Sequence, residues 1–175
     1  YKIEDKNTKT DLLISYFIIS MYMTILILFP EKFSEIYKIG LVGVSISYIL
    51  NLKVLLRVIR SPEIIEVKIE SESKIKLTDV SIVAIILLIM VILSLYLGVC
   101  FINSGGIGVY TNNPTHYDLF YYTIIMFSTI GYGDICPVSS VAKFMSLIIS
   151  FTSFICLTIF VSSILSYKND KWLLK

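Results

Sequence analysis

The sequence predicts an all-α membrane protein, with four transmembrane helices per subunit and a short re-entrant helix between the last two. Hydrophobic residues make up 56% of the 175 residues and charged residues only 16%, whereas soluble domains carry about 25% charged residues. The mean hydropathy is +0.82. The charges are clustered and leave apolar stretches of about 20 residues, the length that a helix needs to cross a bilayer. This composition argues against a disordered chain and against an ordinary soluble domain.

The same composition excludes several classes of function. Lys and Arg number 15 against 13 Asp and Glu, for a net charge of +2, so no basic face is available and no nucleic-acid partner is expected. Three cysteines without Cys-x-x-Cys spacing and a single histidine, His116, argue against a disulfide framework and a zinc site. Ser140 and Lys143 have the spacing of an acyl-enzyme motif, but its companion motifs are missing, so the chain is predicted not to be an enzyme.

Two helices are predicted in residues 1–60, an N-terminal membrane segment. Residues 12–29 carry no charge and predict the first, short span. Residues 39–59 predict the second, although Lys53 and an arginine lie within its last turns, because long basic side chains can reach the interface from a helix end. An interfacial helix is the alternative for this segment. Residues 61–78 are predicted to be a cytoplasmic linker, whose alternating apolar residues fit a small hairpin.

The last two spans are predicted over residues 80–103 and 140–167, which contain the longest charge-free spans of the chain. Four spans place both termini on the same side of the membrane. That side carries twelve Lys and Arg residues against three on the other, and the excess of positive charge predicts that both termini lie in the cytoplasm. We therefore expect a multi-pass protein of the cell membrane.

Between these spans, residues 115–128 predict a short apolar helix. Thr115 and Asp118 have the spacing of a capping box, with Asp in place of the usual Glu, and Asn113 before Pro114 is an alternative start. The helix is too short to cross a bilayer and too apolar to lie in water. Such a re-entrant segment is stable only when it is buried in protein or lines a water-filled cavity.

The residues that follow this helix resemble a known motif. Thr129-Ile130-Gly131-Tyr132-Gly133-Asp134 is similar to Thr-Val-Gly-Tyr-Gly-Asp, the usual selectivity filter of potassium channels, with Ile in place of Val. The resemblance covers residues 80–168 and includes two adjacent aromatic residues in the short helix and Pro137 after the motif. It implies that residues 79–175 are a pore domain made of an outer helix (80–103), a pore helix (115–128), a filter (129–133) and an inner helix (140–167).

The chemistry of potassium explains the motif. A dehydrated potassium ion needs a cage of oxygens in place of its water, and consecutive carbonyls point to one axis only if the backbone alternates in handedness. Gly131 and Gly133 tolerate the positive φ that this alternation requires. The resemblance assigns the ion contacts to the carbonyls of Thr129, Ile130, Gly131 and Tyr132 and to the Thr129 hydroxyl, with Gly133 closing the filter.

The resemblance also implies a set of supporting residues, Tyr121, Tyr122 and Asp134. The ring of Tyr132 is expected to pack against pore-helix aromatics such as Tyr122. Ile125 stands where some family members have a Glu that pairs with the matching Asp. Asp134 therefore needs another donor, for which Tyr122 is the candidate.

A gate is predicted near the end of the inner helix. Leu157, Val161 and Leu165 recur every four residues, so they share one face of a helix. We expect these three side chains to narrow the closed pore.

The expected assembly follows from the single filter strand in the chain. A ring around an ion needs four strands, so a homotetramer is predicted. Residues 30–38 are too few to hold a second pore helix and filter, which argues against the two-pore-domain potassium channels, whose subunits form dimers. The predicted function is passive, potassium-selective conduction; a non-selective cation channel of the same architecture and a non-conducting membrane assembly subunit are the alternatives.

The expected partners are few. They are the other subunits, the lipid bilayer and the potassium ions in the filter, and no cofactor is expected. The chain begins with Tyr1 rather than Met, which fits a piece of a longer protein with a cytoplasmic regulatory domain outside this chain.

Overall fold

The computed structural model describes residues 2–28, 34–60, 77–106 and 109–173, and side chains within residues 10–11, 13–28, 34–56, 85–106 and 109–158. Its elements in chain order are five helices: α1 (Lys2–Leu28), α3 (Tyr37–Arg60), α5 (Leu77–Ser104), α6 (His116–Phe127) and α7 (Ser140–Leu173). The only β pairing in the described part of the chain is an isolated bridge between Tyr110 and Pro137. The all-α prediction is therefore confirmed.

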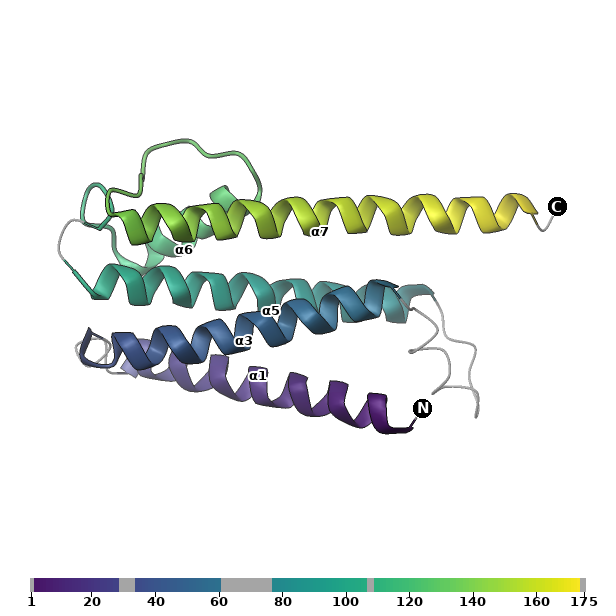
Figure 1. The fold of residues 1–175 in the computed structure, drawn as a ribbon. Coiled ribbons are helices and arrows are strands. Elements are labelled where there is room, and N and C mark those ends of the chain that lie inside the picture. Colours follow the sequence, from purple (N-terminus) through teal and green to yellow (C-terminus); the bar gives the residue numbers. More distant parts are fainter. Residues whose placement is uncertain (1, 29–33, 61–76, 107–108, 174–175) are drawn as a thin grey trace.

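Four long helices run side by side, and the short helix α6 lies at one end of the bundle (Figure 1). The start of α1 and the end of α7 both lie at the opposite end of the bundle. Helix α7 continues to Leu173, beyond the charge-free stretch that predicted an inner helix over residues 140–167. The hairpin expected within residues 61–78 falls mainly on residues 61–76, which lie outside the described residues.

Three of the described helices are long and apolar enough to cross a membrane, over Tyr37–Leu56, Ile85–Ser104 and Ser140–Thr158. The apolar part of α1, Leu13–Leu28, is shorter than these. The second helix predicted over residues 39–59 is therefore long and apolar enough to cross, although it carries charges near the end of α3. One of those charges, Lys53, lies 3.7 Å from Asp11, so an ion pair partly compensates it.

Helix α5 forms the centre of the bundle. Its residues Leu95, Leu97, Val99 and Phe101 are fully or almost fully buried. Helix α3 approaches α5 closely at Gly40, where an added Cβ would lie 2.2 Å from the Phe101 ring. Close packing of this kind matters in lipid, where the hydrophobic effect does not drive helices together.

Hydroxyl groups join the helices across the bundle. The Ser15 and Ser47 hydroxyls lie 2.7 Å apart and link α1 to α3. The Tyr48 hydroxyl lies 2.6 Å from the Thr152 hydroxyl and links α3 to α7. Such interhelical hydrogen bonds hold membrane helices in register, so the first two helices are attached to the segment that carries the filter motif.

Candidate functional site

The short helix α6 begins at a complete capping box. The Thr115 side chain accepts a hydrogen bond from the Asp118 backbone N–H at 3.3 Å, and the Asp118 carboxylate accepts one from the Thr115 backbone N–H at 2.8 Å. Hydrogen bonds from Thr115 lower the pKa of the Asp118 carboxyl. The predicted cap at Thr115 is confirmed, and it fixes where the helix enters the bundle.

The start of α6 is also tied to α5. The Tyr96 hydroxyl donates a hydrogen bond to the His116 carbonyl at 3.3 Å, and the Tyr96 and Phe120 rings pack edge to face with centroids 5.3 Å apart. Desolvation lowers the pKa of the His116 imidazole, although the residue is exposed.

The end of α6 is directed toward the filter motif and is held by α7. Ser153 of α7, 1% exposed, donates a hydrogen bond to the Phe127 carbonyl. That carbonyl is one of the last four of the helix, which have no partner within it. No basic residue lies in the last turn, so the partial negative charge of the helix end is not neutralised and favours a cation beyond it.

The backbone of residues 129–133, called the filter segment below, alternates in handedness. Thr129, Gly131 and Gly133 have φ angles of 61°, 56° and 79°, and among the described residues no other member of the segment has a positive φ. The glycines adopt the conformation that the sequence predicted for them. Thr129 adopts it too, which sequence reasoning missed because a left-handed φ costs a residue with a Cβ about 1–2 kcal/mol.

Hydrogen bonds from the segment to α6 hold this unusual backbone. The Ile130 and Gly131 backbone N–H groups both donate to the Ile125 carbonyl, at 3.1 and 3.4 Å. The Thr129 hydroxyl donates to the Ser128 carbonyl at 2.6 Å. The first carbonyl of the segment is therefore fixed relative to the negative end of α6.

One side of the filter segment is uncovered within a single chain. All of its residues are exposed, with Ile130 at 55% and Tyr132 at 69%. A Cβ added at Gly131 or Gly133 would meet no atom within 4 Å. The Gly133 carbonyl accepts a hydrogen bond from the Cys136 thiol at 3.2 Å, whereas no hydrogen bond from the described residues reaches the carbonyls of residues 129–132. A segment with such carbonyls and an exposed Ile needs further surfaces around it, which other chains can supply.

A second layer of contacts holds the far end of the segment. Tyr121 and Asp134 line the same hollow, and the Asp134 carbonyl accepts a hydrogen bond from the Asn112 side chain at 3.2 Å. The expectation that Tyr122 donates to Asp134 was wrong, because the Tyr122 hydroxyl bonds to Ser146. On a helix, adjacent residues point about 100° apart, and only Tyr121 faces the segment's end.

Tyr122 faces the interior instead. It is 3% exposed, its hydroxyl lies 2.6 Å from the Ser146 hydroxyl, and its ring packs at 5.2 Å against Tyr110. Because Ser146 donates its own proton to the Ala142 carbonyl at 2.9 Å, Tyr122 is the donor to Ser146. Within one chain Tyr122 therefore supports the site by joining α6 to α7, and the Tyr132 ring stays exposed.

Sequence reasoning missed Ser146 as a site residue and did not assign Ser153 a partner. The two serines are seven residues apart, which is two helical turns and places them on one face of α7. Both bond to α6 or to its last carbonyl. A pair of hydroxyls at this spacing in an apolar helix is the signal that could have revealed the face that contacts the pore helix.

The predicted gate is only partly visible. Leu157 is 51% exposed. Val161 and Leu165 lie within α7, but their side chains are outside the described residues. The gate therefore stays a prediction.

Comparisons with known proteins agree with this geometry. The profile of a family described as ion channel matches residues 82–168. Two-pore potassium channel 4 of Arabidopsis thaliana is 35% identical over 112 residues, which cover 61% of this chain and 36% of that protein. Potassium channel K2 of Plasmodium falciparum (isolate 3D7) is 28% identical over 98 residues, covering 51% of this chain and 7% of that protein. No solved structure matches the chain.

These matches describe a segment rather than a whole protein. This chain spans about a third of the first relative and less than a tenth of the second. The family match begins within α5, contains α6 and the filter segment, and ends within α7. The part of the chain that carries α6 and the filter segment therefore belongs to the family described as ion channel.

Proposed function

We propose that this chain is a subunit of a potassium-selective channel in which four copies surround one axis. The observation that carries the proposal is the alternating φ of Thr129, Gly131 and Gly133. Alternation lets successive carbonyls face one direction, and a column of carbonyls can replace the water shell of a potassium ion. The sequence Gly131-Tyr132-Gly133 and the two relatives named potassium channels support potassium as that ion.

The proposed ion contacts are the carbonyls of Thr129, Ile130, Gly131 and Tyr132, with the Thr129 hydroxyl at the inner end. In this arrangement the negative end of α6 favours a cation in a cavity below the filter segment. The exposed side of the segment would face the axis. Potassium is the transported ion in this account and no other cofactor is required.

Four copies are proposed because one filter segment is open on one side and four such segments close a ring. The exposed residues of α7, which include Phe144, Phe151 and Phe154, would then pack against neighbouring copies or line the axis. The Arabidopsis relative is named a two-pore channel, whereas this sequence holds one filter motif. Both termini are proposed to be cytoplasmic, from the twelve-to-three bias of Lys and Arg.

Chemical cross-linking of the purified protein in detergent, with potassium or sodium as the only alkali cation, tests the assembly. The proposal predicts a tetramer that resists heating better in potassium than in sodium, because ions bound between the copies stabilise the assembled state. A monomer or dimer in both salts would contradict it. Planar bilayer recordings of the same sample then separate a channel from a non-conducting assembly subunit.

A further inference from the structure

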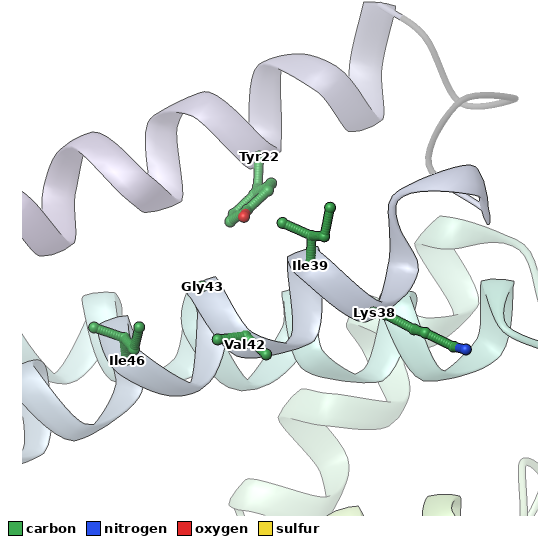
Figure 2. Close-up of a pocket in the computed structure, with 6 residues that line it drawn as sticks. All are labelled: Tyr22, Lys38, Ile39, Val42, Gly43 and Ile46. Atoms are coloured by element: carbon green, nitrogen blue, oxygen red, sulfur yellow. The ribbon is translucent and has the colours of Figure 1, made fainter.

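A groove lies between α1 and α3, far along the chain from the filter segment. It has a volume of about 480 Å³ and is lined by residues of these two helices only: Tyr22, Lys38, Ile39, Val42, Gly43 and Ile46. Figure 2 shows Tyr22 reaching from α1 toward α3, with Ile39 beside it. Nothing in the proposed conduction pathway uses these residues.

The groove is apolar along its length. Ile39, Val42 and Ile46 are 72%, 61% and 48% exposed, and their spacing of three and four residues makes them a stripe on one face of α3. An acyl chain can pack along such a stripe because both are apolar and elongated. In a membrane, the acyl chains of lipids are the available apolar partner.

Two polar groups border this stripe, one at its end and one beside its middle. Lys38 is exposed, and its side chain points toward the start of α3 (Figure 2). Its ammonium lies 5.9 Å from the centre of the Tyr37 ring, and among the described residues no carboxylate pairs with it. The positive end of the α3 dipole adds to the same potential, so this end of the groove is suited to a phosphate.

Tyr22 supplies the second polar group. The residue is only 6% exposed, its hydroxyl borders the groove, and no hydrogen bond from the described residues reaches that hydroxyl. Gly43 makes room for it, since an added Cβ there would lie 2.5 Å from the Tyr22 oxygen. A hydroxyl that is held in an apolar groove without a partner is suited to donate to an ester carbonyl.

The depths of these groups match a phospholipid. Lys38 and Gly43 are five residues apart on α3, which is about 7.5 Å along the helix axis. The headgroup and ester region of one leaflet is roughly 5–8 Å thick. A phosphate at Lys38 therefore places the ester carbonyls near Tyr22 and the acyl chain along Val42 and Ile46.

We propose that this groove binds one anionic glycerophospholipid, with its phosphodiester on Lys38, an ester carbonyl on the Tyr22 hydroxyl and an acyl chain along Val42 and Ile46. The site shares no residue with the filter segment, so lipid binding can be tested separately from the proposed conduction. It also gives the two N-terminal helices a role in fixing the protein to one class of lipid.

The test measures stepwise binding of phosphatidylglycerol to the detergent-purified protein by native mass spectrometry. Lys38→Gln should weaken binding about fivefold, the value of one basic residue at an anionic lipid surface. Val42→Trp should abolish binding by filling the groove, and it should leave folding intact because Val42 is 61% exposed. Lys143→Gln removes an exposed lysine from α7 and is the matched control.

Equal losses in Lys38→Gln and Lys143→Gln would overturn the proposal, since they would indicate only a general attraction to positive charge. Wild-type affinity in Val42→Trp would overturn it as well. Glycerol 3-phosphate tests the headgroup alone, and full displacement of phosphatidylglycerol by this molecule would contradict a role for the apolar groove. A protein that co-purifies on this face in place of lipid would identify a different occupant and would also refute the proposal.

Discussion

Removing either partner of the hydrogen bond between Tyr122 and Ser146 is expected to lower the free energy of unfolding by a different amount. In Ser146→Ala the Tyr122 hydroxyl, on a residue 3% exposed, keeps no acceptor, and an unsatisfied buried donor costs about 1–3 kcal/mol. In Tyr122→Phe the Ser146 hydroxyl still donates to the Ala142 carbonyl, so only the net value of one hydrogen bond is lost, about 0.5–1.5 kcal/mol.

The double variant Tyr122→Phe with Ser146→Ala tests whether the stranded Tyr122 hydroxyl causes the larger loss of stability. Adding Tyr122→Phe to Ser146→Ala removes the stranded hydroxyl, so the double variant should be more stable than Ser146→Ala alone. The two changes should therefore be strongly non-additive, as expected for residues in direct contact. Ser150→Ala changes a partly exposed hydroxyl on the same helix and should cost less than about 0.5 kcal/mol.

Unfolding titrations of the purified protein in mixed detergent micelles would measure these free energies, with all four variants compared in the same potassium concentration. Additive costs in the double variant, or a Ser146→Ala cost no larger than that of Ser150→Ala, would refute the reasoning. Either result would mean that α6 is not held to α7 through this contact.

Three further predictions follow from other contacts. Gly131→Ala places a Cβ on a residue with φ of 56° and should cost about 1–2 kcal/mol per chain from backbone strain alone. We expect this strain to lower potassium flux into proteoliposomes. Gly106→Ala is the control and should leave the flux unchanged. The pKa of the Asp118 carboxyl is lowered in the folded protein, so its cap stabilises α6 at pH values above the ordinary pKa of 3.8. This stabilisation is lost as the pH falls below 3.8. Thermal melts between pH 3 and 6 should show the loss in wild type and little of it in Asp118→Asn. Tyr48→Phe removes the 2.6 Å contact with α7 and should speed amide exchange in α7 around residue 152, and unchanged exchange would contradict a coupling between α3 and α7.

Most features of the fold that the sequence predicted follow from patterns among residues close together in the chain. Charge-free stretches predicted the long helices, the spacing of Thr115 and Asp118 predicted the cap of α6, and Gly131 and Gly133 predicted a backbone that alternates. Each of these features depends on neighbours within a few residues, so the sequence contains the whole cause. The ion pair between Lys53 and Asp11 joins residues 42 apart in the sequence, and no local pattern indicates it.

The contacts that support the filter segment were harder to predict for the same reason. The rotation of α6 decides which tyrosine lies beside Asp134 and which bonds to Ser146, and one step along a helix turns a side chain by about 100°. An error of one residue therefore exchanged the two tyrosines. Thr129 takes its left-handed φ because hydrogen bonds to Ile125 hold the residues after it, a tertiary effect that propensity does not register.

Bi-ionic reversal potentials in planar bilayers test most directly whether the filter segment selects potassium. Wild type, with potassium on one side and sodium on the other, should reverse near the potassium equilibrium potential. Tyr132→Asp should shift the reversal potential toward zero, because four added charges and the lost rings deform the outer carbonyl cage while cations still pass. Tyr117→Asp, which changes an equally exposed tyrosine at the start of α6, should keep the wild-type value. A wild-type reversal potential near zero, or an unchanged potassium preference in Tyr132→Asp, would contradict the account.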